Sequence, residues 1–374
     1  MPADPRTLEL ARRLPKVDLH CHLIGTISAD TVRELARREG IAWDADPGLV
    51  YEQINSVPPA DVDFSATAVS LPPRSPDGAG GYSLLRVTEW VADLLTRRED
   101  FVRIGYEAAT QARARSNTRH LELHVEVGAF RRRGMSYPDV IDGLIEGLTA
   151  ASSELDISSG LIVGIDRSRP AGEAGEIIED VIAHPRDAVV GVGLDNLETA
   201  GPPERFAPAY ARAAAAGLRR TAHAGEHEPT ARNVAACLDV LGCERIDHGY
   251  FTLEDPALVA RCLDEQIPFT CIFTTSRRSW RPWRRDSIRA LLDAGITVVL
   301  ASDDPAMFPT SLADEYAIAA ADLGLDADAL VGLSRRGVDA AWIEEDERCA
   351  LHASFDEEIT HLLADATPAP TNGR

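Results

Sequence analysis

The chain has 374 residues, of which 45% are hydrophobic and 26% are charged, a composition typical of a globular protein with a large core. Its formal net charge of −22 argues against binding nucleic acid through phosphates, because no excess of Lys and Arg is present to replace counterions. The sequence shows no signal peptide, no apolar run of membrane-spanning length and no CxxC pair among its six cysteines. We therefore expect a cytoplasmic protein with reduced thiols, no membrane contact and no structural zinc motif or disulfide framework.

Short β-rich apolar runs alternate with longer Ala-, Leu- and Arg-rich segments of helical period, which is typical of βα units around a parallel sheet. Two of the longer segments, 204–217 and 286–295, are expected to be helices that end at a glycine. The candidate strands are Val17–His22, His120–Val125, Leu161–Asp166, Ala188–Asp195, Arg219–His223, Arg245–Asp247, Pro268–Phe273 and Thr297–Ser302. Eight strands are what a closed barrel requires, so the sequence predicts an α/β fold, a (β/α)₈ barrel of the TIM type.

Two stretches depart from this alternation. Residues 27–118, after the first strand, are expected to form a helical insertion, interrupted by an irregular Pro- and Gly-rich loop at Ala66–Tyr82. Such an insertion would lie at the C-terminal mouth of the barrel, where lids are commonly built. We expect a single domain over residues 1–366, followed by a disordered tail, 367–374.

Metal-binding and acidic residues fall at the ends of the predicted strands. His20 and His22 end the first strand and point to one face of it, since they are two residues apart. His223 ends the fifth strand, His248 follows the sixth, and the pair Asp303 and Asp304 follows the eighth. These ends meet at one mouth of a barrel, where three imidazoles and a carboxylate suit Zn²⁺ with one position left for water. An HxH pair or a DD pair alone is more often incidental, so the indication comes from the whole set.

Four segments resemble signature segments of the adenosine deaminase family, in the same order: PKVDLHCHLIGTIS, HAGEH, RIDHG and LASDDPAMFPTSLADEY. The similarity extends over nearly the whole chain, including RHLELHVEVGAFRRRGMS and VVGVGLDNLE. The resemblance implies a zinc-dependent hydrolytic deaminase with one zinc ion per chain. The motif of the Cys-ligated base deaminases is absent.

The resemblance also implies roles for individual residues. Glu226 matches the residue that protonates the purine ring, and we expect an apolar setting that keeps its carboxyl neutral. His248 matches the histidine that orients the attacking hydroxide, and Asp304 matches the Asp that contacts the water and a ring nitrogen. The residues that match the family's zinc ligands are His20, His22, His223 and Asp303.

Three departures from the family pattern fall on expected substrate contacts. Ile24 replaces the acidic residue that holds the sugar's 5′-hydroxyl, which favours a 5′-modified nucleoside such as aminodeoxyfutalosine or indicates a repacked pocket. Asn196 stands where family members often place a purine-contacting glycine. Arg277 replaces the asparagine of the usual CPxSN segment. The residues expected to contact substrate are Ile24, Asp195, Asn196, Gly225 and Arg277.

Residues 277–285 hold five arginines and two tryptophans, which is unusual in so acidic a chain. They could clamp a substrate carboxylate or phosphate and stack on an aromatic group. The alternative is the start of a surface helix, with arginines paired to acidic neighbours and tryptophans packed on the shell.

Other functions stay open at this point. They are an adenosine or adenine deaminase proper, another metal-dependent amidohydrolase acting on a non-purine amino-heterocycle, a cyclic amide or an ester, and a homologue that only binds a ligand. The expected partner is a small-molecule substrate, and a homo-oligomer is compatible with the sequence. Iron or manganese would fit the same ligands as zinc.

Overall fold

A computed structural model describes residues 4–41, 45–55, 84–226, 228–274, 281–308 and 310–366. In this part of the chain eight parallel strands pair in sequence order into one barrel, which confirms the predicted (β/α)₈ architecture. The strands are β1 (Lys16–His22), β2 (Thr118–Val125), β3 (Ser158–Asp166), β4 (Val189–Asp195), β5 (Arg219–Ala224), β6 (Ile246–His248), β7 (Pro268–Cys271) and β8 (Thr297–Leu300).

The chain segment that follows β8 closes the barrel against β1. Cys21 and Asp303 form a parallel β-bridge. The His22 N–H donates to the carbonyl oxygen of Asp303 at 2.8 Å, and the Asp303 N–H donates to the carbonyl oxygen of His20 at 3.0 Å. These bonds place the segment after β8 directly beside the HxH pair.

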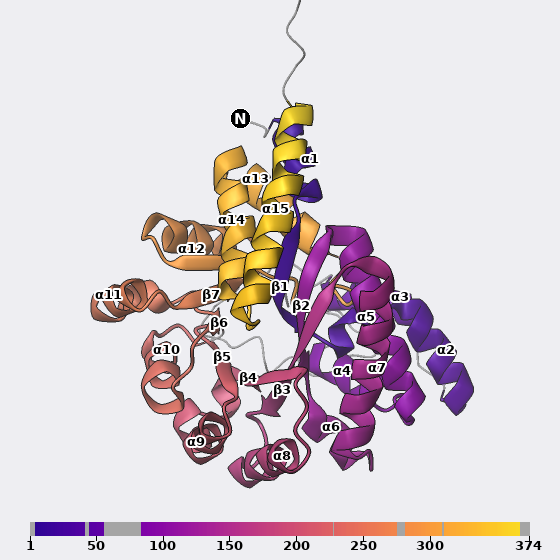
Figure 1. The fold of residues 1–374 in the computed structure, drawn as a ribbon. Coiled ribbons are helices and arrows are strands. Elements are labelled where there is room, and N and C mark those ends of the chain that lie inside the picture. Colours follow the sequence, from indigo (N-terminus) through magenta and orange to yellow (C-terminus); the bar gives the residue numbers. More distant parts are fainter. Residues whose placement is uncertain are drawn as a thin grey trace, which may run out of the picture.

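Helices surround the barrel (Figure 1). Their N-termini follow the expected capping chemistry: the Ser28 hydroxyl accepts from the Thr31 N–H, and the Asp255 carboxylate accepts from the Ala257 N–H. The helices are α1 (Pro5–Arg13), α2 (Ala29–Glu39), α3 (Pro47–Asn55), α4 (Leu84–Ala92), α5 (Arg98–Ser116), α6 (Val127–Arg132), α7 (Tyr137–Leu155), α8 (Ala171–Ala183), α9 (Ala207–Ala215), α10 (Arg232–Ala236), α11 (Pro256–Asp264), α12 (Arg281–Asp293), α13 (Leu312–Asp322), α14 (Ala327–Ala340) and α15 (Glu345–Ala366).

The stretch 27–118 contains α2 to α5. Helix α5 packs along α7 and against β2, so it belongs to the ring of helices around the barrel (Figure 1). The loop predicted at Ala66–Tyr82 and the tail 367–374 lie outside the described residues. The role of the stretch as a lid stays a prediction.

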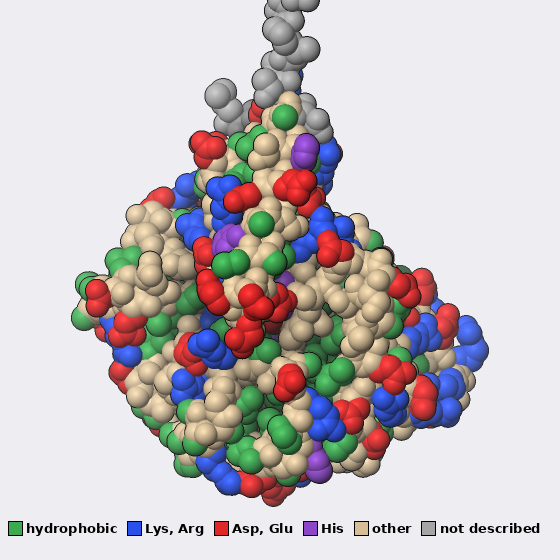
Figure 2. Space-filling model, viewed as in Figure 1, with side chains coloured by type: hydrophobic (Ala, Val, Ile, Leu, Met, Phe, Trp, Pro, Cys, Tyr) green, Lys and Arg blue, Asp and Glu red, His purple; other side chains and the backbone are tan. Residues whose placement is uncertain are grey.

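The surface carries both signs of charge. On the face drawn in Figure 2, Lys and Arg side chains lie interspersed with Asp and Glu. None of the helices in the described residues has the length and apolar character needed to cross a membrane.

Candidate active site and metal centre

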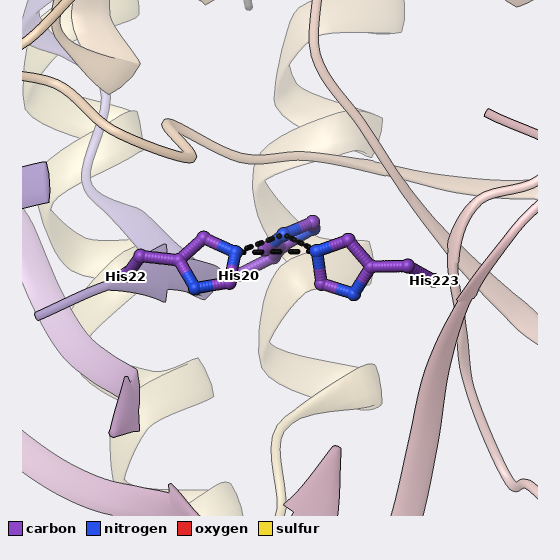
Figure 3. Close-up of side chains that lie close together, drawn as sticks. All are labelled: His20, His22 and His223. Atoms are coloured by element: carbon purple, nitrogen blue, oxygen red, sulfur yellow. Dashed lines mark hydrogen bonds between the residues drawn. The ribbon is translucent and has the colours of Figure 1, made fainter. Parts of the chain in front are cut away.

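Three imidazoles converge at the C-terminal mouth of the barrel. His20 and His22 come from β1 and His223 comes from β5. The three Nε2 atoms form a nearly equilateral triangle (Figure 3), with separations of 3.3 Å for His20–His22, 3.1 Å for His20–His223 and 3.2 Å for His22–His223. Ligands about 2.0–2.1 Å from a tetrahedral Zn²⁺ are separated by about 3.3 Å, so this triangle has the dimensions of a zinc site.

Hydrogen bonds at the opposite ring nitrogen fix the tautomer of two of these histidines. His22 Nδ1 lies 2.7 Å from Glu126 Oε1, and His20 Nδ1 lies 3.0 Å from Thr270 Oγ1. The Thr270 hydroxyl gives its own proton to Asp247 Oδ1 at 2.8 Å, so it accepts a proton from His20 Nδ1.

Two buried carboxylates lie close to Nδ1 of His223. Its Nδ1 lies 3.3 Å from Asp195 Oδ1 and 3.5 Å from Asp247 Oδ2. With the protons on Nδ1, three Nε2 lone pairs face one another at hydrogen-bond distance. Such an arrangement is stable around a cation, and the donor set therefore fits a divalent metal.

The carboxylate of Asp303 lies beside this triangle. Its Oδ1 lies 3.6 Å from His20 Nε2 and 3.5 Å from His22 Nε2. The residue has a positive φ of 62°, a conformation that non-glycine residues adopt mainly where the surroundings force it. Next to it, a Cβ added to Gly25 would lie 2.2 Å from Asp304 Oδ1, so only glycine fits between the turn after β1 and Asp304.

His248 and Asp304 adjoin this centre. His248 is the last residue of β6, whereas the sequence placed it after that strand, and its ring centroid lies 5.0 Å from those of His20 and His223. Burial lowers the pKa of His248 well below its ordinary value, so its imidazole is neutral. Burial and the neighbouring Asp303 raise the pKa of Asp304.

The expected apolar setting of Glu226 is wrong. Its carboxylate is buried, but Oε1 accepts from Nη2 of Arg284 at 3.0 Å and Oε2 lies 3.4 Å from His248 Nε2. The sequence could not show this, because the contact depends on which face α12 turns towards the barrel. Arg284 itself is fully buried.

The predicted substrate contacts are distributed around the mouth. Ile24 is buried in the short turn Ile24–Thr26 that follows β1. The Asn196 side-chain oxygen accepts from the Leu197 N–H at 2.7 Å, and the Gly225 N–H donates to Glu198 at 2.7 Å. Asp195 lies behind His223, and Arg277 is outside the described residues. Contact of these five residues with a substrate stays a prediction.

Several residues that support the site were not singled out from the sequence. Asp247 precedes His248 in RIDHG, and Glu198 ends the run GLDNLE. Both lie in segments that resemble the family, but neither stands at a spacing typical of metal ligands. His124 on β2 is buried, and its Nδ1 lies 3.2 Å from Asp195 Oδ1. Its ring centroid lies 5.1 Å from those of His20 and His22. Burial alone would raise the pKa of Asp195, but the imidazoles of His124 and His223 hold it below its ordinary value.

The chain is similar to known proteins along nearly its whole length. A model of the family described as adenosine deaminase matches residues 15–358. An adenine deaminase from Cupriavidus necator is 33% identical over 372 residues, which cover 99% of this chain and 98% of the relative.

Two solved structures are similar along their whole length. An amidohydrolase from Burkholderia ambifaria with bound zinc has a TM-score of 0.84 at 29% identity and covers 98% of both chains. An adenine deaminase from Arthrobacter aurescens has a TM-score of 0.80 at 26% identity, covering 94% of this chain and 99% of that one.

Proposed function

The chain belongs to the adenosine deaminase family and is a hydrolytic deaminase of aminopurines, and from this we propose that its substrate is a 6-aminopurine without the free 5′-hydroxyl of adenosine. The observation that supports the hydrolytic reaction is the convergence of three Nε2 atoms on one point, with Asp303, Glu226 and His248 around it. The products would be ammonia and the corresponding 6-oxopurine.

We propose one zinc ion per chain, held by His20, His22, His223 and Asp303. The bound zinc supplies a Lewis acid that lowers the pKa of water towards neutrality. Glu126 and the buried residues Thr270 and Asp247 keep the imidazoles oriented, and such supporting bonds raise the basicity of the ligands.

The chain's own residues supply the proton transfers. Glu226 donates a proton to the ring nitrogen beside the amino-bearing carbon, which makes that carbon electrophilic. His248 orients the attacking water and stabilises the charge that develops on its oxygen. Asp304 contacts the water and a second ring nitrogen, and attack at the amino-bearing carbon then leads to loss of ammonia.

The choice of purine rests on Ile24. An apolar side chain leaves a buried 5′-hydroxyl without a partner, at a cost of roughly 1–3 kcal/mol, so adenosine is disfavoured. A 5′-modified nucleoside such as aminodeoxyfutalosine avoids this cost. Free adenine, which has no sugar, avoids it too, and the names of the similar adenine deaminases favour it as the second candidate.

The test is ammonia release from the zinc-loaded protein. The panel contains adenine, adenosine, methylthioadenosine, S-adenosylhomocysteine, adenosine monophosphate, aminodeoxyfutalosine and several non-purine amino-heterocycles. We expect kcat/KM for a 5′-modified nucleoside or for adenine to exceed that for adenosine at least tenfold. Faster turnover of adenosine would overturn the substrate preference, whereas silence on every purine with zinc bound would overturn the purine class.

The same assay separates the other functions. An amidohydrolase that opens a cyclic amide or ester would release no ammonia from the panel. A homologue that only binds ligands would retain the purine without converting it. The intact set of Glu226, His248 and the metal ligands favours an active enzyme.

A further inference from the structure

Helix α12 places the buried guanidinium of Arg284 beside Glu226. Arg284, the fourth residue of this helix, is 0% exposed. Its Nη2 donates to Glu226 Oε1 at 3.0 Å. Its Nη1 lies 3.5 Å from both the Tyr250 hydroxyl and the carbonyl oxygen of Ile272.

The ring of Tyr250 packs against this guanidinium. The guanidinium carbon of Arg284 lies 5.0 Å from the centroid of the Tyr250 ring, within the range of a cation–π contact. The Tyr250 hydroxyl donates to the carbonyl oxygen of Ile272 at 2.8 Å and accepts from its N–H at 3.1 Å. Arg284 is therefore fixed against the backbone that follows β7.

Residues 283–285 are the part of the Arg- and Trp-rich segment whose side chains the structure describes. Arg285 pairs with Asp286, and Trp283 packs on Tyr250 and Phe251, as expected for the start of a surface helix. Arg284 differs from both of these residues, because it is buried and its two terminal nitrogens contact Glu226, Tyr250 and Ile272 inside the protein.

We propose that Arg284 is a positioning residue that determines which oxygen of Glu226 carries the proton, an inference that rests on the proposed function. A guanidinium has only donors, so the oxygen that faces it can only accept. Oε1 is thereby held by Arg284, and the proton of Glu226 resides on Oε2. Oε2 lies 3.4 Å from Nε2 of His248, the residue that orients the attacking water in the proposed function. Oε2 is therefore the oxygen on the side where the purine reacts, and it exchanges the proton with the ring nitrogen.

The proton balance is complete with these groups. Glu226 gives the proton on Oε2 to the ring nitrogen and becomes a carboxylate whose charge Arg284 balances. Water supplies the oxygen of the product and two protons: one leaves with the amino group as ammonia, and the other returns to Glu226, because the ring nitrogen of the product keeps the proton that it received. Arg284 neither gains nor loses a proton at any step.

The test compares variants of the zinc-loaded enzyme on the purine it turns over fastest. Arg284→Met should lower kcat about 100-fold, the effect of a misplaced catalytic group, with zinc content and KM within about threefold of wild type. Arg284→Lys, which keeps a charged donor, should recover most of the loss. Arg285→Met is the matched control on the same helix and should stay within twofold of wild type.

A double-mutant cycle separates positioning from a general structural role. In a Glu226→Gln background, Arg284→Met should cause no further loss of kcat if Arg284 acts through Glu226. A further 100-fold loss, or normal kcat in Arg284→Met itself, would overturn the proposal. Lack of ammonia release by the wild-type enzyme would overturn the proposed function instead.

A crystal structure of the Arg284→Met variant tests the inference without turnover. The Glu226 carboxylate should leave its wild-type position there and keep it in Arg284→Lys. An unmoved carboxylate in Arg284→Met would contradict the positioning role whatever the activity.

Discussion

The carboxylate of Glu198, in the turn after β4, accepts a hydrogen bond from the backbone N–H of Glu226, in the loop after β5, at 3.0 Å. Its two oxygens also accept from the N–H groups of Gly225 at 2.7 Å and Glu228 at 3.1 Å, and from the Asn233 amide at 2.9 Å. The four partners named here are all donors, so this position favours a group that only accepts. Glu198 thus shapes the loop that presents Glu226.

We expect Glu198→Gln to lower the free energy of unfolding by about 1–3 kcal/mol, because its amide would face donors that need an acceptor. The same change should lower kcat at least tenfold, since Glu226 would lose its backbone support. Urea denaturation and ammonia release measure the two effects. Glu357→Gln, at an exposed position, is the control, and equal behaviour of the two variants would contradict the role of Glu198.

Glu126 should control metal affinity through His22. Its Oε1 lies 2.7 Å from His22 Nδ1, which orients the ring and holds the proton away from Nε2. Loss of such a partner typically costs about 10–100-fold in metal affinity, so Glu126→Ala should show this change in zinc competition titrations. Glu176→Ala, an exposed glutamate on α8, should bind zinc like the wild type. Unchanged affinity in Glu126→Ala would mean that Asp303 and the other two histidines fix the site without it.

Glu226→Gln tests the proton donor directly. An amide can occupy the same volume and keep a contact with Arg284, but it has no proton to give to the ring nitrogen. We expect turnover to fall by at least about 1,000-fold, consistent with the loss of a general acid. Zinc content and the urea midpoint should stay unchanged, because Glu226 is not among the four proposed ligands. Turnover near that of the wild type would assign the proton transfer to another group.

The barrel and the convergence of the proposed metal ligands were predictable because their signals are local. Buried parallel strands read as apolar runs, and the pair His20 and His22 lies on one face by the two-residue period of a strand alone. The observed strands begin or end within three residues of the expected ones, and His248 lies inside β6 instead of after it.

The supporting residues were not predictable for the opposite reason. Glu198 acts on Glu226 across 28 residues of sequence, and Thr270 reaches His20 across 250. Neither residue belongs to a motif with ligand-like spacing. In the sequence Arg284 is only one of five arginines in residues 277–285, and the sequence does not show which side of α12 faces the barrel. Such contacts follow from tertiary packing.

Lys16, the only lysine of the chain, gives stability a pH dependence. Burial lowers the pKa of its ammonium to about 7 from 10.5, although Glu358 opposes the shift. Its Nζ donates to the carbonyl oxygens of Leu14 at 2.7 Å and Arg12 at 2.9 Å. Between pH 7 and 10.5 the unfolded chain binds more protons than the folded chain at this residue, so its contribution to the free energy of unfolding rises with pH.

The expected slope is up to about 1.4 kcal/mol per pH unit over that range. Urea denaturation at pH 7.5, 8.5 and 9.5 should show the rise as a difference between the wild type and Lys16→Met, which has no group to titrate. Because the chain has one lysine, labelling it on the ε-carbon gives a single NMR resonance whose titration reports the pKa. A pKa near 10.5 in the folded protein would contradict the prediction.

Ile24→Asp tests the substrate preference. Ile24 is 4% exposed in the turn between β1 and α2, and a carboxylate at this position could accept a hydrogen bond from the 5′-hydroxyl of a nucleoside. Pairing a buried hydroxyl that was unpaired is worth about 1–3 kcal/mol, so kcat/KM for adenosine should rise roughly 5–150-fold relative to a 5′-modified nucleoside. Ile24→Val keeps an apolar side chain and should leave that ratio unchanged, while both variants should bind zinc as the wild type does. A ratio that is the same in Ile24→Asp and Ile24→Val would mean that residue 24 lies away from the 5′ end of the substrate, and the preference against adenosine would then have to come from another part of the pocket.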